Sequence, residues 1–332
     1  MPLDRQGRGL NLTSLVAAVL GLALFAWFVQ RIGPSEIWEG LRDVGWGLVV
    51  VVAIAGLRFA LRAVAWTTCL ERPHVMSFSA AFSAVLAGDS LGNLTPLGLF
   101  ASEPAKAAFV RGRVPLGAAI TALAIENILY TLSAVAMIAA STAALLIEFE
   151  LPPAIRTAGW IAIALIIAIF VATAWLIWQR PALVSWMASF VVPKTSKLQE
   201  RIVQVRDLEA RIYAFARQRP DALLPALAAE AGFHALGVVE VYVTWWLMLS
   251  RPPSILTAFI LEGALRLIVV VFKFVPLQLG VAEWTTGSFT QLLGYGAATG
   301  GTLSIVRKVR TVFWVLIGTI LLIRRGVTSR SG

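Results

Sequence analysis

The chain has 332 residues, of which 58% are hydrophobic and 14% are charged. Because an ordinary soluble domain carries about 25% charged residues, this composition excludes a cytosolic globular enzyme and indicates a membrane protein. The 28 Lys and Arg residues against 18 Asp and Glu give a formal net charge of +10, which in a membrane protein indicates basic cytoplasmic loops rather than nucleic-acid binding.

Six apolar stretches are long enough to cross the hydrocarbon core as helices, which takes about 20 residues each. In chain order they are 10–29, 45–70, 116–147, 157–178, 222–249 and 300–323. Two further apolar stretches, 77–113 and 254–298, are interrupted by Gly and Pro, and we expect each to form a re-entrant hairpin. No small-residue cleavage motif follows the first stretch, so we expect a span there and not a cleaved signal peptide.

The distribution of Lys and Arg predicts the orientation, because cytoplasmic loops carry an excess of these residues. Arg5 and Arg8 precede the first span, segment 180–220 carries eight basic against three acidic residues, and Arg324 and Arg325 follow the last span. Six spans and two hairpins that return to their own side place both termini and segment 180–220 in the cytoplasm. Counting either hairpin as a span would put the C-terminal arginines outside.

Segment 180–220 also has a helical pattern. Apolar residues recur at helical spacing with basic residues between them, namely at Leu198, Ile202, Val205, Leu208, Ile212 and Phe215. This pattern predicts an amphipathic helix. Two placements fit it: on the inner leaflet of the membrane, or solvated and packed on the helix bundle.

The two halves of the chain share a motif at an offset of 180 residues. Pro96, Leu97, Leu99 and Glu103 match, without a gap, Pro276, Leu277, Leu279 and Glu283. Glu is rare inside apolar blocks, so this match carries more weight than the apolar matches around it. Each half, 1–150 and 151–332, then runs span, span, hairpin, span. An odd number of spans per half inverts the second half, so we predict an all-α polytopic membrane protein with an inverted 3+3 repeat, as in many secondary transporters. The alternative is a duplication that left a symmetric bundle without a transport role.

Many ionisable residues fall at membrane depth. Each costs about 2.5–3.5 kcal/mol on insertion scales, so they must pair internally or line a wet cavity. Ten residues are our candidates for substrate binding: Arg58, Arg62, Asn93, Glu103, Lys106, Glu126, Arg266, Glu283, Arg307 and Arg310. The basic ones suit a phosphate headgroup, because Arg offers its oxygens a planar fork and Lys a point charge.

Glu103 and Glu283 are expected in the first turn of the half-helix that follows each hairpin tip. There a carboxylate has a structural role, capping the helix and pairing with an arginine across the pseudo-twofold axis. It also has a functional role, as a proton- or cation-coupling carboxylate or as a gate that releases arginine when phosphate arrives. Both roles stay open from the sequence.

The sequence offers little for metal binding or catalysis. The single cysteine, Cys69, excludes an intramolecular disulfide and a cysteine metal cluster, and two histidines leave little for a metal site. P-loop, His-x-x-Glu-His and Gly-x-Ser-x-Gly motifs are absent, so we expect no metal, no cofactor and no enzymatic activity. His234, one turn after Glu230, fits either a proton relay or a satisfied buried histidine. The weak candidates for a nucleophile or base are Asp89, Ser90 and His74.

At these motifs the chain resembles the flippase-like transmembrane region of lysylphosphatidylglycerol synthases and their stand-alone relatives. The first family element matches Asn93, Pro96 and Glu103, with Lys106 where Arg is usual and Ser102 where Gly often precedes the Glu. The second family element and the Arg-bearing last span match Pro276, Gly280, Glu283, Arg307 and Arg310. The resemblance implies movement or handling of a phospholipid, a polyprenyl-phosphate-linked glycolipid or a hopanoid in the bacterial inner membrane. The aminoacyltransferase domain of the bifunctional synthases has no room here, so lysine transfer is not expected.

The sequence therefore predicts a flippase-like protein whose partner is a membrane lipid with an anionic headgroup, the tail remaining in the bilayer through a lateral opening. Three alternatives remain. They are a small-solute or ion transporter on the same plan, a membrane enzyme acting on lipid headgroups, and an accessory protein that scaffolds lipid or glycolipid biosynthesis through segment 180–220.

Overall fold

The computed structural model describes residues 44–95, 98–179, 198–249, 253–272 and 280–328, together with residues 35, 38, 42 and 278. Within these residues every named element is an α-helix. The predicted first span at 10–29, segment 180–197, and Pro96 and Pro276 of the repeated motif lie outside the described residues.

Four described helices are long and apolar enough to cross a membrane. They are α3 (Gly47–Thr68), α6 (Leu116–Glu148), α7 (Pro153–Gln179, apolar over Pro153–Ala172) and α10 (Pro220–Met248). Each covers one of the spans predicted from the sequence. The sixth predicted span, 300–323, lies within one continuous helix, α13 (Ala297–Thr328).

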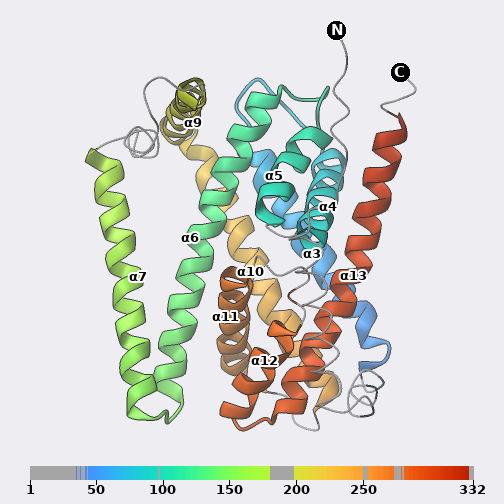
Figure 1. Ribbon diagram of the computed structural model, residues 1–332, viewed down its shortest axis with the longest axis vertical. Coiled ribbons are helices and arrows are strands. Elements are labelled where there is room, and N and C mark those ends of the chain that lie inside the picture. Colours follow the sequence, from blue (N-terminus) through green and yellow to red (C-terminus); the bar gives the residue numbers. More distant parts are fainter. Residues whose placement is uncertain are drawn as a thin grey trace.

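The two interrupted stretches each form a pair of shorter helices. Stretch 77–113 contains α4 (Phe78–Leu94) and α5 (Gly98–Phe109), and stretch 254–298 contains α11 (Ile255–Val271) and α12 (Val281–Leu292). Gly280 precedes α12 with φ +78°, a left-handed conformation that glycine adopts without steric cost. Figure 1 shows α4 and α5 in the upper half of the molecule and α11 and α12 in the lower half.

Helices from the two halves of the chain pack against one another. α3 and α10 run side by side through the centre, α4 packs on α13, and α11 packs on α6. The short helices α4 and α11 thus each lie against the last long helix of the other half of the chain. α7 packs on α6 at one edge, and its apolar side chains such as Leu165 and Phe170 are exposed, as expected for helices that face acyl chains.

Small side chains allow the helices to approach closely. A Cβ added to Gly318 on α13 would lie 2.0 Å from Ser90 Oγ on α4, and one added to Gly263 on α11 would lie 1.7 Å from Ser141 Oγ on α6. Between membrane helices there is no hydrophobic driving force, so close packing and interhelical hydrogen bonds stabilise such crossings. Ser90 supplies one of them, donating to the Val315 carbonyl at 3.0 Å.

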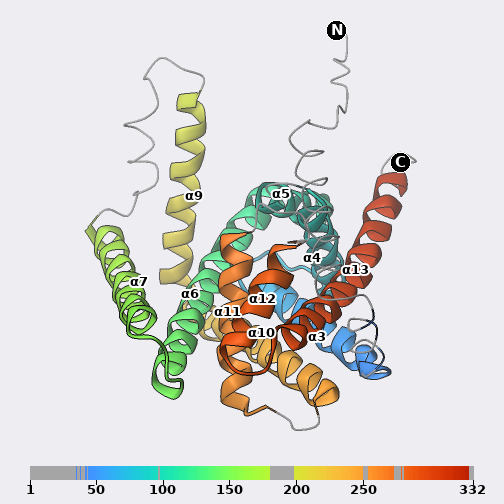
Figure 2. The same ribbon diagram turned by 60° about the horizontal axis from the view of Figure 1, so that its bottom comes forward.

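The amphipathic segment forms α9 (Leu198–Gln218), which lies at the upper end of the molecule in Figure 1 and extends away from the bundle beyond its contact with α6 in Figure 2. Phe215 is buried and, with Ile212, packs on an apolar cluster that includes Ala222 and Ala226 of α10. Val203 is exposed. The C-terminal half of α9 therefore packs on the bundle, one of the two placements predicted, and contact of its other face with a leaflet stays a prediction.

Candidate functional site

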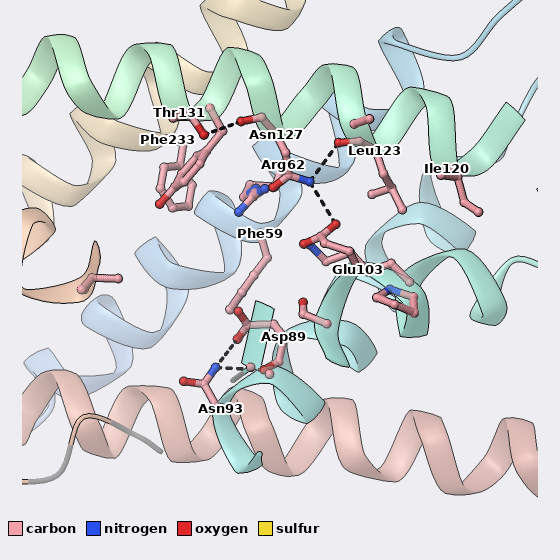
Figure 3. A pocket seen from close by; sticks show the side chains of 18 of the residues that line it. Phe59, Arg62, Asp89, Asn93, Glu103, Ile120, Leu123, Asn127, Thr131 and Phe233 are labelled. Atoms are coloured by element: carbon pink, nitrogen blue, oxygen red, sulfur yellow. Dashed lines mark hydrogen bonds and ion pairs between the residues drawn. The ribbon is translucent and has the colours of Figure 1, made fainter. Parts of the chain in front are cut away.

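Two adjoining cavities lie between the two halves of the chain. The larger has a volume of about 670 Å³ and the smaller about 210 Å³, in the range expected of ligand sites when taken together. Their walls share Phe59, Asp89, Asn93, Phe233 and Arg266. These side chains come from α3, α4, α10 and α11, so the site is assembled from distant parts of the chain (Figure 3).

The walls of the two cavities are strongly basic. Among the described residues that line them, seven are basic and two are acidic. The basic residues are Arg58, Arg62, Lys106, Arg266, Arg307, Lys308 and Arg310. The acidic residues are Asp89 and Glu103. Such a wall favours an anionic ligand.

Glu262 on α11 lies behind the smaller cavity and is fully buried. Its carboxylate accepts hydrogen bonds from Arg266 and Arg307, each at 2.7 Å, and from Arg58 at 3.4 Å. Gly237 on α10 makes room for it, because a Cβ there would lie 2.4 Å from Glu262 Oε1. One carboxylate thus orients three guanidinium groups from three helices.

Glu240 on α10 is the second fully buried acid of this cluster. It accepts hydrogen bonds from Arg58 and Arg310, each at 2.9 Å, and lies 3.4 Å from Arg307. Two carboxylates cannot neutralise the four arginines that converge on them. This cluster of four arginines and two glutamates therefore carries an excess of two positive charges, and Asp89 adds one acidic group to the same wall.

Arg62 connects the larger cavity to another buried acid, Glu126 on α6. Its guanidinium donates to Glu126 Oε1 at 2.7 Å and lies 4.4 Å from the centre of the Tyr130 ring, a cation–π geometry. Tyr130 also accepts a hydrogen bond from Arg266 at 3.2 Å. The tyrosine thereby contacts two cavity arginines, Arg62 through the face of its ring and Arg266 through its hydroxyl group.

Glu103, labelled in Figure 3, and Lys106 of α5 form a pair in the wall of the larger cavity. The Glu103 carboxylate accepts a hydrogen bond from Lys106 Nζ at 2.7 Å and one from Asn127 on α6 at 3.0 Å. In the other half, Lys308 on α13 donates to the fully buried Glu283 of α12. Each glutamate thus pairs with a side chain of the long helix that follows it, 24 and 25 residues on.

Two expectations about these glutamates are wrong. Their ion-pair and hydrogen-bond partners lie in their own half of the chain, and no arginine from the other half pairs with them among the described residues. Glu283 lies in the first turn of α12, but Glu103 does not lie in the first turn of α5. The reason is that α5 already begins at Gly98, whereas the left-handed Gly280 delays the start of α12.

Eight of the ten predicted site residues line the two cavities: Arg58, Arg62, Asn93, Glu103, Lys106, Arg266, Arg307 and Arg310. Glu126 and Glu283 do not line them; both are buried behind the wall and hold Arg62 and Lys308. Asn93 donates to Asp89 at 2.9 Å, one turn away on α4 (Figure 3). The structure therefore divides the predicted set into residues that face the cavity and residues that support them.

The predicted set omitted several lining residues: Phe59, Asp89, Asn127, Tyr130, Phe233 and Lys308. Helical spacing contained a signal for some of them. Tyr130 follows Glu126 by one turn on the same face of α6, and Phe59 lies between Arg58 and Arg62 on α3. Phe233 gave no such signal, because its role depends on α10 packing against α3.

The family model described as "Lysylphosphatidylglycerol synthase TM region" matches residues 14–318. The match extends from the predicted first span into the last helix, α13, and includes both pairs of short helices. Neither a curated protein nor a solved structure matches the chain.

Proposed function

Because this chain belongs to the lysylphosphatidylglycerol synthase transmembrane-region family, we propose that it is a multi-pass membrane protein that translocates an anionic lipid across the bacterial cytoplasmic membrane. The observation that carries the proposal is the pair of adjoining cavities with seven basic and two acidic wall residues. A phosphate group presents several acceptor oxygens to such arginines, and charge-assisted hydrogen bonds of this kind are strong. The chain's role is transport, without a catalytic step.

The lining of the larger cavity supports a lipid ligand over a small solute. Apolar side chains, among them Phe59, Leu123 and Val269, share the wall with the basic ones. Ile120 and Thr131 of α6 and Pro104 of α5 also line it and are exposed on the side of the molecule. A lipid can therefore place its headgroup among the arginines while its tail leaves between α5 and α6 into the bilayer.

An inverted repeat with six spans and two re-entrant hairpins gives this site access from both faces. Three relationships support it: α4 packs on α13 as α11 packs on α6, α3 packs on α10, and each hairpin glutamate pairs with the long helix that follows it. α4–α5 and α11–α12 occupy opposite halves of the molecule (Figure 1). In such an arrangement, rocking one half against the other exposes the site alternately. Both termini and α9 then lie on the cytoplasmic side.

The buried acids explain how the site stays stable without lipid. A buried arginine that loses its partner costs about 3–5 kcal/mol, so empty guanidinium groups need internal counter-ions. Glu240, Glu262 and Glu126 supply these counter-ions from behind the wall. An arriving phosphate contacts the cavity side of the same guanidinium groups and satisfies the excess positive charge.

Reconstitution of the purified protein tests the proposal. Proteoliposomes of phosphatidylcholine would carry tail-labelled fluorescent phosphatidylglycerol, and a membrane-impermeant quencher would report the label that reaches the outer leaflet. We expect translocation by the wild-type protein and a loss of at least tenfold in Arg266→Gln, because Arg266 lines both cavities. Arg156→Gln, on the exposed face of α7, is the matched control and retains the rate.

The same vesicles distinguish the alternatives. Entry of radiolabelled inorganic phosphate without movement of labelled lipid favours a small-solute transporter. Movement of neither substrate favours an accessory protein, and lipid movement that persists after deletion of α9 separates transport from a scaffolding role of that helix. Equal movement of labelled phosphatidylcholine and phosphatidylglycerol contradicts selection by the basic wall.

A further inference from the structure

We infer that Glu126 on α6 and Glu230 on α10 share a proton, and that this pair couples lipid binding at Arg62 to proton uptake. The inference rests on the proposed function for its coupling step. The shared proton itself rests on the burial and the unpaired oxygens of the two carboxyl groups. It assigns a role to Glu230, which lines neither cavity.

Glu230 is the most isolated carboxyl group of the site region. Its side chain is fully buried, and neither oxygen has a hydrogen-bond partner within the described part of the chain. Glu126 is also buried, and its Oε2 likewise has no partner there. Buried polar groups are almost always hydrogen-bonded, so three unsatisfied carboxyl oxygens need an explanation.

The two glutamates lie on helices that pack together, α6 and α10, and their carboxyl groups interact electrostatically. A single guanidinium, that of Arg62, forms an ion pair with Glu126 and interacts electrostatically with Glu230. Two carboxylates beside one cation in a dry interior cannot both be ionised. A proton on one carboxyl supplies the missing donor.

The remaining charged and titratable groups near the pair are engaged elsewhere. Lys106 on α5 interacts with Glu230 but forms its ion pair with Glu103. His234, one turn along α10, contacts Ser133 at 3.1 Å and stacks on Tyr130. Cys69, the residue that follows α3, is a buried thiol that interacts electrostatically with both glutamates.

The surroundings favour a proton over a metal ion. Ala122 and Ala226, one turn before the two glutamates, belong to the apolar core cluster that also contains Cys69. Neither glutamate lines either of the two cavities described above. No group of three His, Cys, Asp or Glu side chains suited to a metal occurs in the described residues.

Arg62 provides the link to the ligand, because the same guanidinium lines the larger cavity and holds Glu126. A phosphate that binds Arg62 from the cavity competes with Glu126 for it. The carboxylate left without a counter-ion then takes a proton from a hydronium ion of the adjoining aqueous phase, leaving a carboxylic acid and water. Binding of the anion and of the proton therefore favour each other, and the coupling is reciprocal.

Infrared spectroscopy of the protein in nanodiscs tests the shared proton without any ligand. The carbonyl stretch of a protonated carboxyl group is separate from that of a carboxylate. We expect such a band at neutral pH in the wild-type protein and its loss in both Glu230→Gln and Glu126→Gln. Glu148→Gln, at the exposed end of α6 and away from both cavities, is the control and retains the band. Absence of the band from the wild-type protein, or its removal by Na⁺ at constant pH, overturns the inference.

Calorimetric titration with dihexanoyl-phosphatidylglycerol, in two buffers of different ionisation enthalpy, tests the coupling. We expect net proton uptake on binding, lost in Glu230→Gln while binding persists, and unchanged in Glu148→Gln, which lies outside both cavities. Binding with no proton uptake by the wild-type protein contradicts the coupling. Failure of the lipid to bind at all contradicts the proposed function instead, and leaves the infrared result as the test of the proton site.

Discussion

Arg58 on α3 donates a hydrogen bond of 2.9 Å to Glu240 on α10, across 182 residues of sequence and through the contact between the two central helices. The side chains are 6% and 0% exposed, so this ion pair is inside the protein and not at a surface. It joins the two halves of the chain at the wall of the proposed lipid site. Because the pair is buried, removing either partner leaves the other charge without this counter-ion in the protein interior.

Glu262→Gln is expected to destabilise the protein by about 3–5 kcal/mol, because three arginines lose a shared, fully buried counter-ion. Thermal unfolding in detergent, followed by tryptophan fluorescence, measures the change. Glu148→Gln, at the exposed end of α6, is the control and leaves the midpoint unchanged. Equal midpoints for the two variants would show that the buried cluster does not depend on this carboxylate.

Gly237→Ala is expected to destabilise the same cluster by steric crowding rather than by loss of a charge. The new Cβ would lie 2.4 Å from Glu262 Oε1, and overpacking of this kind costs about 1–3 kcal/mol. Gly117→Ala meets its nearest atom at 3.6 Å and, as a helical glycine, should be neutral or slightly stabilising. A lower unfolding midpoint for Gly237→Ala than for Gly117→Ala is the expected measurement, and the reverse order contradicts the packing described.

Single cysteines in a Cys69→Ala background test the hairpins. Ser77→Cys before α4 and Arg113→Cys after α5 should react with a membrane-impermeant maleimide from the same, cytoplasmic side of oriented vesicles. Ser254→Cys and Ala298→Cys, which flank α11 and α12, should both react from the opposite side. All four positions are exposed. Reaction of Ser77→Cys and Arg113→Cys from opposite sides would mean that α4 and α5 together cross the membrane.

Native mass spectrometry of the purified protein should show an anionic lipid bound to the wild-type chain. Arg62→Gln and Lys106→Gln each remove a cation from the wall of the larger cavity and should reduce the bound fraction by at least tenfold. Arg113→Gln, exposed between α5 and α6, is the control for loss of positive charge alone. Each of the three variants removes one positive charge. If all three lose the same share of bound lipid, the result contradicts a specific site.

Local sequence signals predicted the elements well. Uninterrupted apolar stretches became α3, α6, α7 and α10, and the two stretches broken by Gly and Pro each became two shorter helices. The family resemblance, read from short motifs around Asn93, Glu103, Gly280 and Glu283, agrees with the family match over 14–318. These features follow from hydrophobic length and from residues that break helices, both of which act along the chain.

The sequence by itself determined that charged residues lie at membrane depth and must avoid lipid. Only the tertiary structure decided which of them face the cavity and which support the wall, placing Arg62 at the wall, Glu126 behind it, and Glu230 without a partner in the described chain. The physical reason is that helical periodicity fixes neighbours three and four residues apart. The pairing of Arg58 with Glu240 depends instead on how α3 docks against α10, which no local pattern encodes.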